Sequence, residues 1–183
     1  MVTGKNNILL TFDDGPHPIW TPKILDLLKE YNTKAIFFVL GKRVLSNAHL
    51  IRRMIDEGHF IGNHSMNHWL LLFNTNKIFH AEIVSVHKMM LEQFGYTIRY
   101  FRPPWGIIHK KLKIRCETEL DYEILLWNTD SLDYIWPFGR RLPVKKYNNE
   151  NIILMHDGHA FSPVANKKHT LLMLENHLKS LHS

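Results

Sequence analysis

The sequence predicts an α/β fold built on a parallel β-sheet. Short apolar segments alternate with longer amphipathic segments, and almost every apolar segment is followed by a polar residue able to do chemistry. Strands that alternate with helices form a parallel sheet, either open or closed into a barrel. An open dinucleotide-binding sheet is the competing architecture, but no Gly-x-Gly-x-x-Gly motif follows the first apolar segment.

Six short apolar segments have the length and composition of buried strands. The first is flanked by polar residues, and the second is bounded by Gly41. The predicted strands are residues 8–10, 35–39, 59–62, 98–101, 123–127 and 151–155.

Helices are predicted between these strands from apolar residues spaced by three or four. The first begins at Thr21, whose hydroxyl would cap it, with Pro22 at the first helical position. The next two end at glycines, Gly58 and Gly95. These two helices and the last one cover about residues 50–55, 77–94 and 171–181.

Length and composition fit a single domain over residues 1–183. The chain is 45% hydrophobic and 22% charged, which excludes a disordered chain. No apolar run is long enough to span a membrane, for which about 18 residues are needed. No secretory leader precedes the first strand, which predicts a cytoplasmic protein. A chain whose leader had been removed would instead be extracellular or in the envelope.

The net charge of +6 does not point to nucleic acid. The densest basic stretch, residues 139–146, contains no zinc finger, RNA-binding signature or basic helix with interleaved aromatic residues. We interpret it as a solvated loop, with an acidic partner or an anionic glycan as the alternative. Cys116 is the only cysteine, so no intramolecular disulfide forms, and we expect a small buried group on a helix.

Reactive side chains follow the predicted strands at the point where each strand ends. In a parallel barrel these carboxyl ends share one rim, where active sites are built from several strands. The sequence therefore predicts an active site assembled from Asp13, Asp14, His64, His68, Arg102, Asp130, Asp133, His156 and Asp157.

Asp14, His64 and His68 form a candidate metal site. Histidine nitrogen and carboxylate oxygen suit zinc, and three protein ligands leave a position free for water. The two histidines are four residues apart, but the preceding Gly62-Asn63 favours a turn over a helix. Alternatively, the paired aspartates cap the next segment and the histidines form hydrogen bonds in the core, which would be a costly use of two carboxylates.

Four further residues suit acid–base chemistry. Asp13 faces away from Asp14 and can take a proton from water. Arg102 is the expected partner that keeps Asp13 ionised. His156 can protonate a leaving amine, and either Asp133 or Asp130 can orient it. The alternative for each is an ordinary salt bridge on the rim.

Five motifs in order resemble those of the polysaccharide deacetylase family, also called carbohydrate esterase family 4 or the NodB homology domain. The resemblance runs from Thr11 to about Leu178, and the first two motifs are highly specific. The five motifs are Thr11-Phe12-Asp13-Asp14-Gly15-Pro16, His64-Ser65-Met66-Asn67-His68, Arg102-Pro103-Pro104-Trp105-Gly106, Asp130-Ser131-Leu132-Asp133-Tyr134 and Leu154-Met155-His156.

The resemblance implies roles for the residues in these motifs. It gives Asp13 as base, His156 as acid paired with Asp133, and Arg102 as support for the base. It implies that the backbone amide of Trp105 binds the oxyanion and that Leu154 lines the acetyl pocket. The implied metal ligands are Asp14, His64 and His68.

The resemblance also implies the fold and the reaction. The fold is an irregular, distorted TIM-like (β/α) barrel of about seven strands around one divalent ion. Zinc is expected, with Co²⁺ or Ni²⁺ as alternatives. The reaction is removal of N-acetyl or O-acetyl groups from sugar polymers, with a glycan as partner and no implied oligomeric state.

The sequence departs from the family pattern in four places. Tyr134 replaces a usual tryptophan beside the substrate groove, and Trp105 replaces a common tyrosine. The chain ends with the helix that carries Leu181 instead of a closing strand, which predicts a barrel open at one seam. Most relatives also act outside the cell or in its envelope, which conflicts with the missing leader.

The predicted function is N-deacetylation of an N-acetylglucosamine-type glycan. One alternative is an esterase that removes O-acetyl groups from a glycan such as xylan with the same residues. The other is a catalytically silent carbohydrate-binding relative, against which the presence of Asp13 and His156 counts. Trp20, Trp69, Trp105 and Tyr134 are candidates to stack on sugar rings, with core packing as their alternative.

Overall fold

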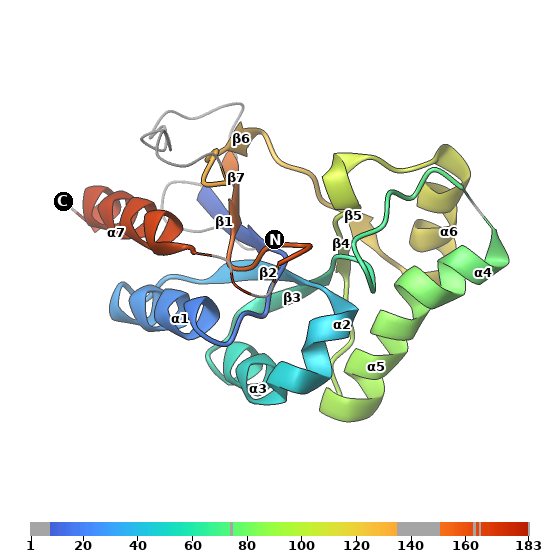
Figure 1. Ribbon diagram of the computed structural model, residues 1–183, viewed down its shortest axis with the longest axis horizontal. Coiled ribbons are helices and arrows are strands. Elements are labelled where there is room, and N and C mark those ends of the chain that lie inside the picture. Colours follow the sequence, from blue (N-terminus) through green and yellow to red (C-terminus); the bar gives the residue numbers. More distant parts are fainter. Residues whose placement is uncertain (1–7, 74, 135–150, 163, 165, 183) are drawn as a thin grey trace.

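The computed structural model describes residues 8–73, 75–134, 151–162, 164 and 166–182 (Figure 1). A single sheet runs through them, with all strand pairs parallel and the order β5-β4-β3-β2-β1-β7-β6. The strands are β1 (Ile8–Asp13), β2 (Ala35–Val39), β3 (Phe60–Asn63), β4 (Tyr100–Phe101), β5 (Glu123–Ile124), β6 (Thr129–Asp130) and β7 (Asn151–His156).

Helices lie between the strands as an alternating pattern requires. The α-helices are α1 (Trp20–Glu30), α2 (Gly41–Val44), α3 (Ala48–Asp56), α4 (Asn76–Phe79), α5 (Ser85–Phe94), α6 (Lys110–Leu120) and α7 (Lys168–His182). A π-helical segment, His80–Val84, joins α4 to α5, and short 3-10 turns cover Leu45–Asn47 and Pro104–Gly106.

The seven parallel strands form a curled half-barrel surrounded by helices, which confirms the predicted irregular (β/α) barrel (Figure 1). In the part of the chain that the structure describes, the barrel is open. The two outermost strands of the sheet are β5 and β6, which are consecutive in the chain.

The central strands are buried on both faces, as expected for a parallel sheet covered by helices. All five residues of β2 are buried, and the rings of Phe12 and Phe37 stack at 5.1 Å between β1 and β2. The predicted face of α7 is also inside, because Leu174 and Leu178 are fully buried. Cys116 is buried on α6, as predicted.

The prediction that the hydroxyl of Thr21 caps the first helix was wrong. Helix α1 begins at Trp20, and its N-cap residue Ile19 makes no side-chain cap. The hydroxyl of Thr21 instead accepts a hydrogen bond from the amide of His17 at 2.7 Å and donates to Asp157 at 2.5 Å. A partner far along the chain therefore takes the hydroxyl that the sequence pattern assigned to a cap.

Other boundaries follow the sequence more closely. Gly58 and Gly95 have φ of +75° and +64° and follow α3 and α5, as predicted for glycines at helix ends. The predicted helix over residues 77–94 exists but is interrupted by the π-helical segment. No described helix is long and apolar enough to cross a membrane. The basic stretch at residues 139–146 lies outside the described residues.

Candidate metal centre and active site

The carboxyl ends of the strands surround a cavity of about 360 Å³. The sheet register brings these ends together, since Asp13 pairs with His156 across β1 and β7 and with Phe38 across β1 and β2. The cavity is lined by Asp13, Asp14, His64, His68, Pro103, Trp105, Gly106, Trp127, Asp130, Tyr134, Leu154, His156, His159, Ala160, Phe161 and Lys167.

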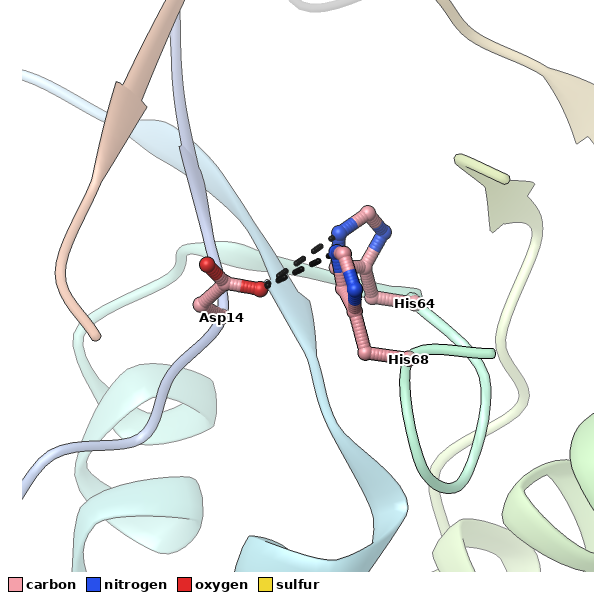
Figure 2. Close-up of side chains that lie close together, drawn as sticks. All are labelled: Asp14, His64 and His68. Atoms are coloured by element: carbon pink, nitrogen blue, oxygen red, sulfur yellow. Dashed lines mark ion pairs between the residues drawn. The ribbon is translucent and has the colours of Figure 1, made fainter. Parts of the chain in front are cut away.

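Three of these residues form a buried cluster able to hold a metal ion. One ligand atom from each of Asp14, His64 and His68 lies within 4.8 Å of the others. The Oδ1 atom of Asp14 lies 3.7 Å from Nε2 of His64 and 3.5 Å from Nε2 of His68. Figure 2 shows the carboxylate from the end of β1 pointing toward both imidazoles. The structure thus assembles the three residues that the sequence singled out.

The protonation of these groups favours a cation. The Oδ1 atom of Asp14 is buried and has no hydrogen-bond partner among the described residues. Burial raises the pKa of Asp14, but His64 and His156 outweigh that effect and leave the pKa below its ordinary value. Burial, together with His64, lowers the pKa of His68 to about 4. A carboxylate oxygen without a hydrogen-bond partner beside a neutral imidazole is a suitable ligand set.

A backbone carbonyl orients the imidazole of His64, and a side-chain hydroxyl holds the backbone of His68. Nδ1 of His64 lies 2.7 Å from the carbonyl oxygen of Arg102, which leaves Nε2 facing Asp14. The hydroxyl of Ser65 accepts a hydrogen bond from the amide of His68 at 2.9 Å. Ser65 and His68 both have left-handed backbones, with φ of 69° and 65°. The segment is therefore a tight turn, which agrees with the prediction from Gly62-Asn63.

Glu82 holds this turn and was not predicted as a site residue. Its carboxylate accepts hydrogen bonds from the backbone and side-chain amides of Asn67 at 2.9 and 2.7 Å, and its carbonyl accepts from the amide of Met66 at 2.8 Å. The neighbouring carbonyl of Ile83 accepts from Nδ2 of Asn63 at 3.0 Å. The sequence did contain a signal, because Glu82 is an acidic residue on the helical face that buries Phe79 and Val86.

Arg102 and Asp13 form a buried ion pair. A guanidinium nitrogen of Arg102 donates to Oδ1 of Asp13 at 2.8 Å and to the hydroxyl of Thr11 at 2.7 Å. The other nitrogens donate to the carbonyls of Leu125 and Leu126 at 2.9 and 3.2 Å. The second carboxylate oxygen of Asp13 lies 3.7 Å from His64, on the side of the metal cluster. The predicted partnership of Arg102 with Asp13 is therefore present.

His156 is paired with Asp133 and not with Asp130. Nδ1 of His156 lies 2.7 Å from the Asp133 carboxylate, which also accepts a hydrogen bond from the hydroxyl of Thr170 at 2.6 Å. Burial lowers the pKa of His156, but Asp133 more than reverses this and the pKa is raised. Asp130 accepts from the amide of Leu132 at 2.8 Å and from the hydroxyl of Tyr134 at 3.1 Å.

Aromatic and apolar residues complete the cavity wall. The ring of Trp105 lies 5.2 Å from the ring of His68 and stacks on Phe161 at 6.0 Å. The ring of Tyr134 lies edge-on to His156 at 5.5 Å, and Leu154 forms part of the wall. Trp105 and Tyr134 thus line the cavity.

Two buried charged residues near the cavity were not assigned a role. Asp157 is fully buried, and this burial raises the pKa of its carboxyl to about 7. The hydrogen bond that the Thr21 hydroxyl donates to the carboxyl opposes this rise. Lys167 is 4% exposed and lines the cavity, where its charge acts on Asp14, Asp133 and His156. Asp157 follows His156 directly, whereas nothing in the sequence pattern separates Lys167 from the adjacent Lys168.

The cavity thus combines a cation site, a carboxylate held by an arginine, and a histidine held by an aspartate. A model of the polysaccharide deacetylase family matches residues 1–124, which include the Asp14, His64 and His68 cluster and the Asp13–Arg102 pair. The chain belongs to the polysaccharide deacetylase family. This confirms the family that the five motifs indicated.

Relatives within the polysaccharide deacetylase family include peptidoglycan and chitooligosaccharide deacetylases. A peptidoglycan-N-acetylglucosamine deacetylase of Listeria monocytogenes is 37% identical over 160 residues, which cover 85% of this chain. The match covers 33% of that relative, so the chain spans about a third of its length. A chitooligosaccharide deacetylase of Bradyrhizobium sp. is 32% identical over 162 residues, covering 86% of this chain and 74% of the relative.

Solved structures of polysaccharide deacetylases share the fold. A crystal structure of a peptidoglycan N-acetylglucosamine deacetylase superposes with a TM-score of 0.81 and 28% sequence identity. The superposition covers 98% of this chain and 83% of the other.

Proposed function

We propose that this protein is a zinc-dependent deacetylase that hydrolyses N-acetyl groups of an N-acetylglucosamine-type polysaccharide or oligosaccharide. One observation carries the proposal: Asp13, which pairs with Arg102, and His156, which pairs with Asp133, line the same cavity as the Asp14, His64 and His68 cluster. The relatives named above support it, because both are deacetylases of N-acetylated glycans by name.

The cluster fits a divalent ion with one open position. A buried carboxylate oxygen without a hydrogen-bond partner faces two imidazole nitrogens, and that donor set suits zinc. Co²⁺ and Ni²⁺ accept the same ligands. When bound, such an ion supplies a Lewis acid for the acetyl carbonyl and lowers the pKa of water.

Asp13 is the proposed base. Arg102 occupies its Oδ1 atom at 2.8 Å and leaves Oδ2 directed toward the cluster, where it takes a proton from the attacking water. The guanidinium of Arg102 and this carboxylate form an ion pair in a buried site. The remaining guanidinium nitrogens are held by backbone carbonyls, so the pair has a fixed geometry.

His156 is the proposed acid. Asp133 holds its Nδ1 and raises its pKa, which keeps a proton available on the other ring nitrogen for the leaving amine. The backbone amide of Trp105 is the proposed donor to the negative oxygen of the tetrahedral intermediate. Leu154 forms the apolar wall for the acetyl methyl group, and Tyr134 contacts the sugar.

The rival substrate is an O-acetyl ester. The hydrolytic residues would be the same, since the acid would protonate an alcohol in place of an amine. The names of the relatives favour the amide. A silent carbohydrate-binding protein is the less favoured alternative, because the base and the acid each retain their charged partner.

Acetate release from N-acetylglucosamine oligomers tests the proposal. Protein stripped of metal should be inactive, and added zinc should restore release. Acetylated xylan, assayed in parallel, separates amide from ester hydrolysis. No release from either substrate with zinc bound would contradict the proposal and favour the silent alternative.

Two variants test the assigned roles. Asp13→Asn should abolish turnover while zinc stays bound, because the base lies outside the ligand set. His64→Ala should lose the zinc itself, measured by metal analysis after gel filtration. Retained turnover in Asp13→Asn would refute the assignment of the base.

A further inference from the structure

Five large apolar side chains project into solvent beside the cavity. We call them the apolar patch, and they are Trp69, Leu70, Leu72, Phe73 and Ile107. Their exposed fractions are 59%, 45%, 46%, 68% and 49%. Four of them fall within five consecutive residues that directly follow the metal-cluster residue His68. Exposed apolar residues are normal when scattered, but a contiguous group indicates a binding surface.

The backbone explains why Leu70 and Leu72 face outward. Leu71 is 1% exposed and forms an isolated parallel bridge with Ile108, and the amide of His109 donates to the Leu71 carbonyl at 3.4 Å. Side chains alternate along an extended segment, so burying Leu71 directs Leu70 and Leu72 outward. The same bridge places Ile107 next to this segment. The exposure of Leu70 and Leu72 therefore results from an anchored backbone.

The patch is separate from the cavity wall. None of its five side chains lines the cavity, whereas the neighbouring Trp105 does. A sugar-binding surface combines aromatic rings with polar groups that pair with hydroxyls, and the cavity has both in Trp105, Tyr134 and Asp130. The patch is mainly aliphatic and phenyl, which suits hydrocarbon better than a glycan.

Positive charge borders the patch. Lys110 and Lys111 begin α6, two and three residues after the bridged Ile108, and Lys77 lies in the first turn of α4. The loop from β3 passes α6 on its way to α4 (Figure 1). A hydrogen bond of 2.9 Å from Arg115 to Asn76 ties the two helices together. All three lysines are exposed and form no ion pair with any described residue.

We propose that the apolar patch and the three lysines dock this protein on the surface of an anionic phospholipid bilayer. Tryptophan, leucine and phenylalanine side chains insert at the boundary between headgroups and acyl chains, and lysines beside them bind anionic headgroups. Docking through this surface holds the neighbouring cavity near the lipid. The inference does not depend on the proposed deacetylase activity.

Charge favours a lipid surface over a second copy of this chain. The chain has a net charge of +6, and self-association through the patch would bring two sets of lysines together. An anionic bilayer satisfies the apolar groups and the lysines at the same time.

Sedimentation with vesicles tests the proposal. The intact protein should bind vesicles of phosphatidylglycerol and phosphatidylcholine, and should bind pure phosphatidylcholine vesicles far more weakly. Binding should weaken with added salt. The variant Lys77→Gln/Lys110→Gln/Lys111→Gln should bind roughly 100-fold more weakly. The variant Leu72→Ser/Phe73→Ser should lose roughly tenfold or more.

Matched variants control for charge and hydrophobicity. Lys23→Gln/Lys29→Gln/Lys88→Gln removes the same charge from exposed positions elsewhere, and Leu45→Ser/Leu172→Ser removes equally exposed leucines. Both controls should bind as the unchanged protein does. Circular dichroism checks that each variant is folded.

Three results would overturn the proposal. The first is an absence of binding to anionic vesicles, and the second is equal loss of binding in the patch variants and their controls. The third is a dimer in lipid-free solution that Leu72→Ser/Phe73→Ser dissociates, which would assign the patch to a second copy. Acetate release is measured separately, so failure of docking and failure of the proposed activity are distinguishable.

Discussion

At the scale of single residues, the cavity depends on two buried pairs, Arg102 with Asp13 and His156 with Asp133. Arg102 has no exposed surface, and its guanidinium lies 4.1 Å from the ring centre of Phe38. A charge in such a position is tolerated because Asp13, Thr11 and two backbone carbonyls satisfy it. Groups proposed to act in hydrolysis are therefore part of the core.

Removing the charge of Arg102 should destabilise the protein. In Arg102→Gln the Asp13 carboxylate stays buried without its cation, and such a loss costs about 3–5 kcal/mol of unfolding free energy. Urea denaturation of the metal-free protein measures it. The exposed Arg99, which pairs loosely with Asp121 at 3.6 Å, provides the control, since Arg99→Gln should cost less than about 1 kcal/mol. Equal costs for the two variants would contradict this account.

The pairing of His156 with Asp133 should set the basic limb of the pH profile. Asp133 raises the pKa of His156, so the acid form persists to higher pH. In Asp133→Asn the pKa of His156 falls, and kcat/KM should decline from a lower pH than in the unchanged enzyme. Asp130→Asn, which alters a carboxylate that does not contact His156, should leave that limb in place. An unchanged limb in Asp133→Asn would remove His156 from the role of acid.

At the scale of elements, the π-helical segment connects a helix to the candidate metal site. The apolar spacing predicted one helix over residues 77–94, and the interruption at His80–Val84 was not expected. Periodicity cannot detect it, because the apolar face continues through the segment. The interruption has a tertiary cause, since carbonyls of Glu82 and Ile83 accept hydrogen bonds from the turn that carries His64 and His68.

Glu82→Ala should weaken zinc binding. The turn loses its two hydrogen bonds from Asn67, and loss of such outer partners typically reduces metal affinity 10–100-fold. Competition with a chromophoric chelator measures the affinity. Glu92→Ala, at an exposed position on α5, is the control and should bind zinc normally. If Glu82→Ala binds zinc with unchanged affinity, the turn does not need this support.

The predicted strand over residues 123–127 also differs from the observed one. Strand β5 ends at Ile124, and the carbonyls of Leu125 and Leu126 accept hydrogen bonds from Arg102 instead of a neighbouring strand. The strand resumes as the separate β6 at Thr129. The seam of the half-barrel therefore lies between β5 and β6, where Arg102 donates hydrogen bonds to two backbone carbonyls.

At the scale of the whole molecule, stability should depend on pH through Asp157. Its pKa is raised from 3.8 to about 7 in the folded protein. The stabilisation from the neutral carboxyl is complete below about pH 4 and is lost as pH rises through about 7. The side chain introduced by Asp157→Asn cannot ionise. Between pH 4 and pH 7 the unfolding free energy of the variant should therefore rise by a few kcal/mol relative to that of the unchanged protein.

Urea denaturation of both metal-free proteins at several pH values measures this difference. Asp56→Asn, on the exposed side of α3, is the control and should run parallel to the unchanged protein. A constant difference between Asp157→Asn and the unchanged protein at every pH would show that folding does not raise the pKa of Asp157.

The sequence by itself determined the parallel α/β architecture and the family, because strand and helix periods, glycine stops and short motifs are local properties. It also named Asp14, His64 and His68 before any geometry was known. Tertiary structure alone decided that Thr21 serves Asp157 instead of a helix end, and where the sheet opens. These outcomes depend on which buried groups meet in the folded protein. Hydrogen bonds between residues far apart in the chain produce no local spacing pattern from which they could be predicted.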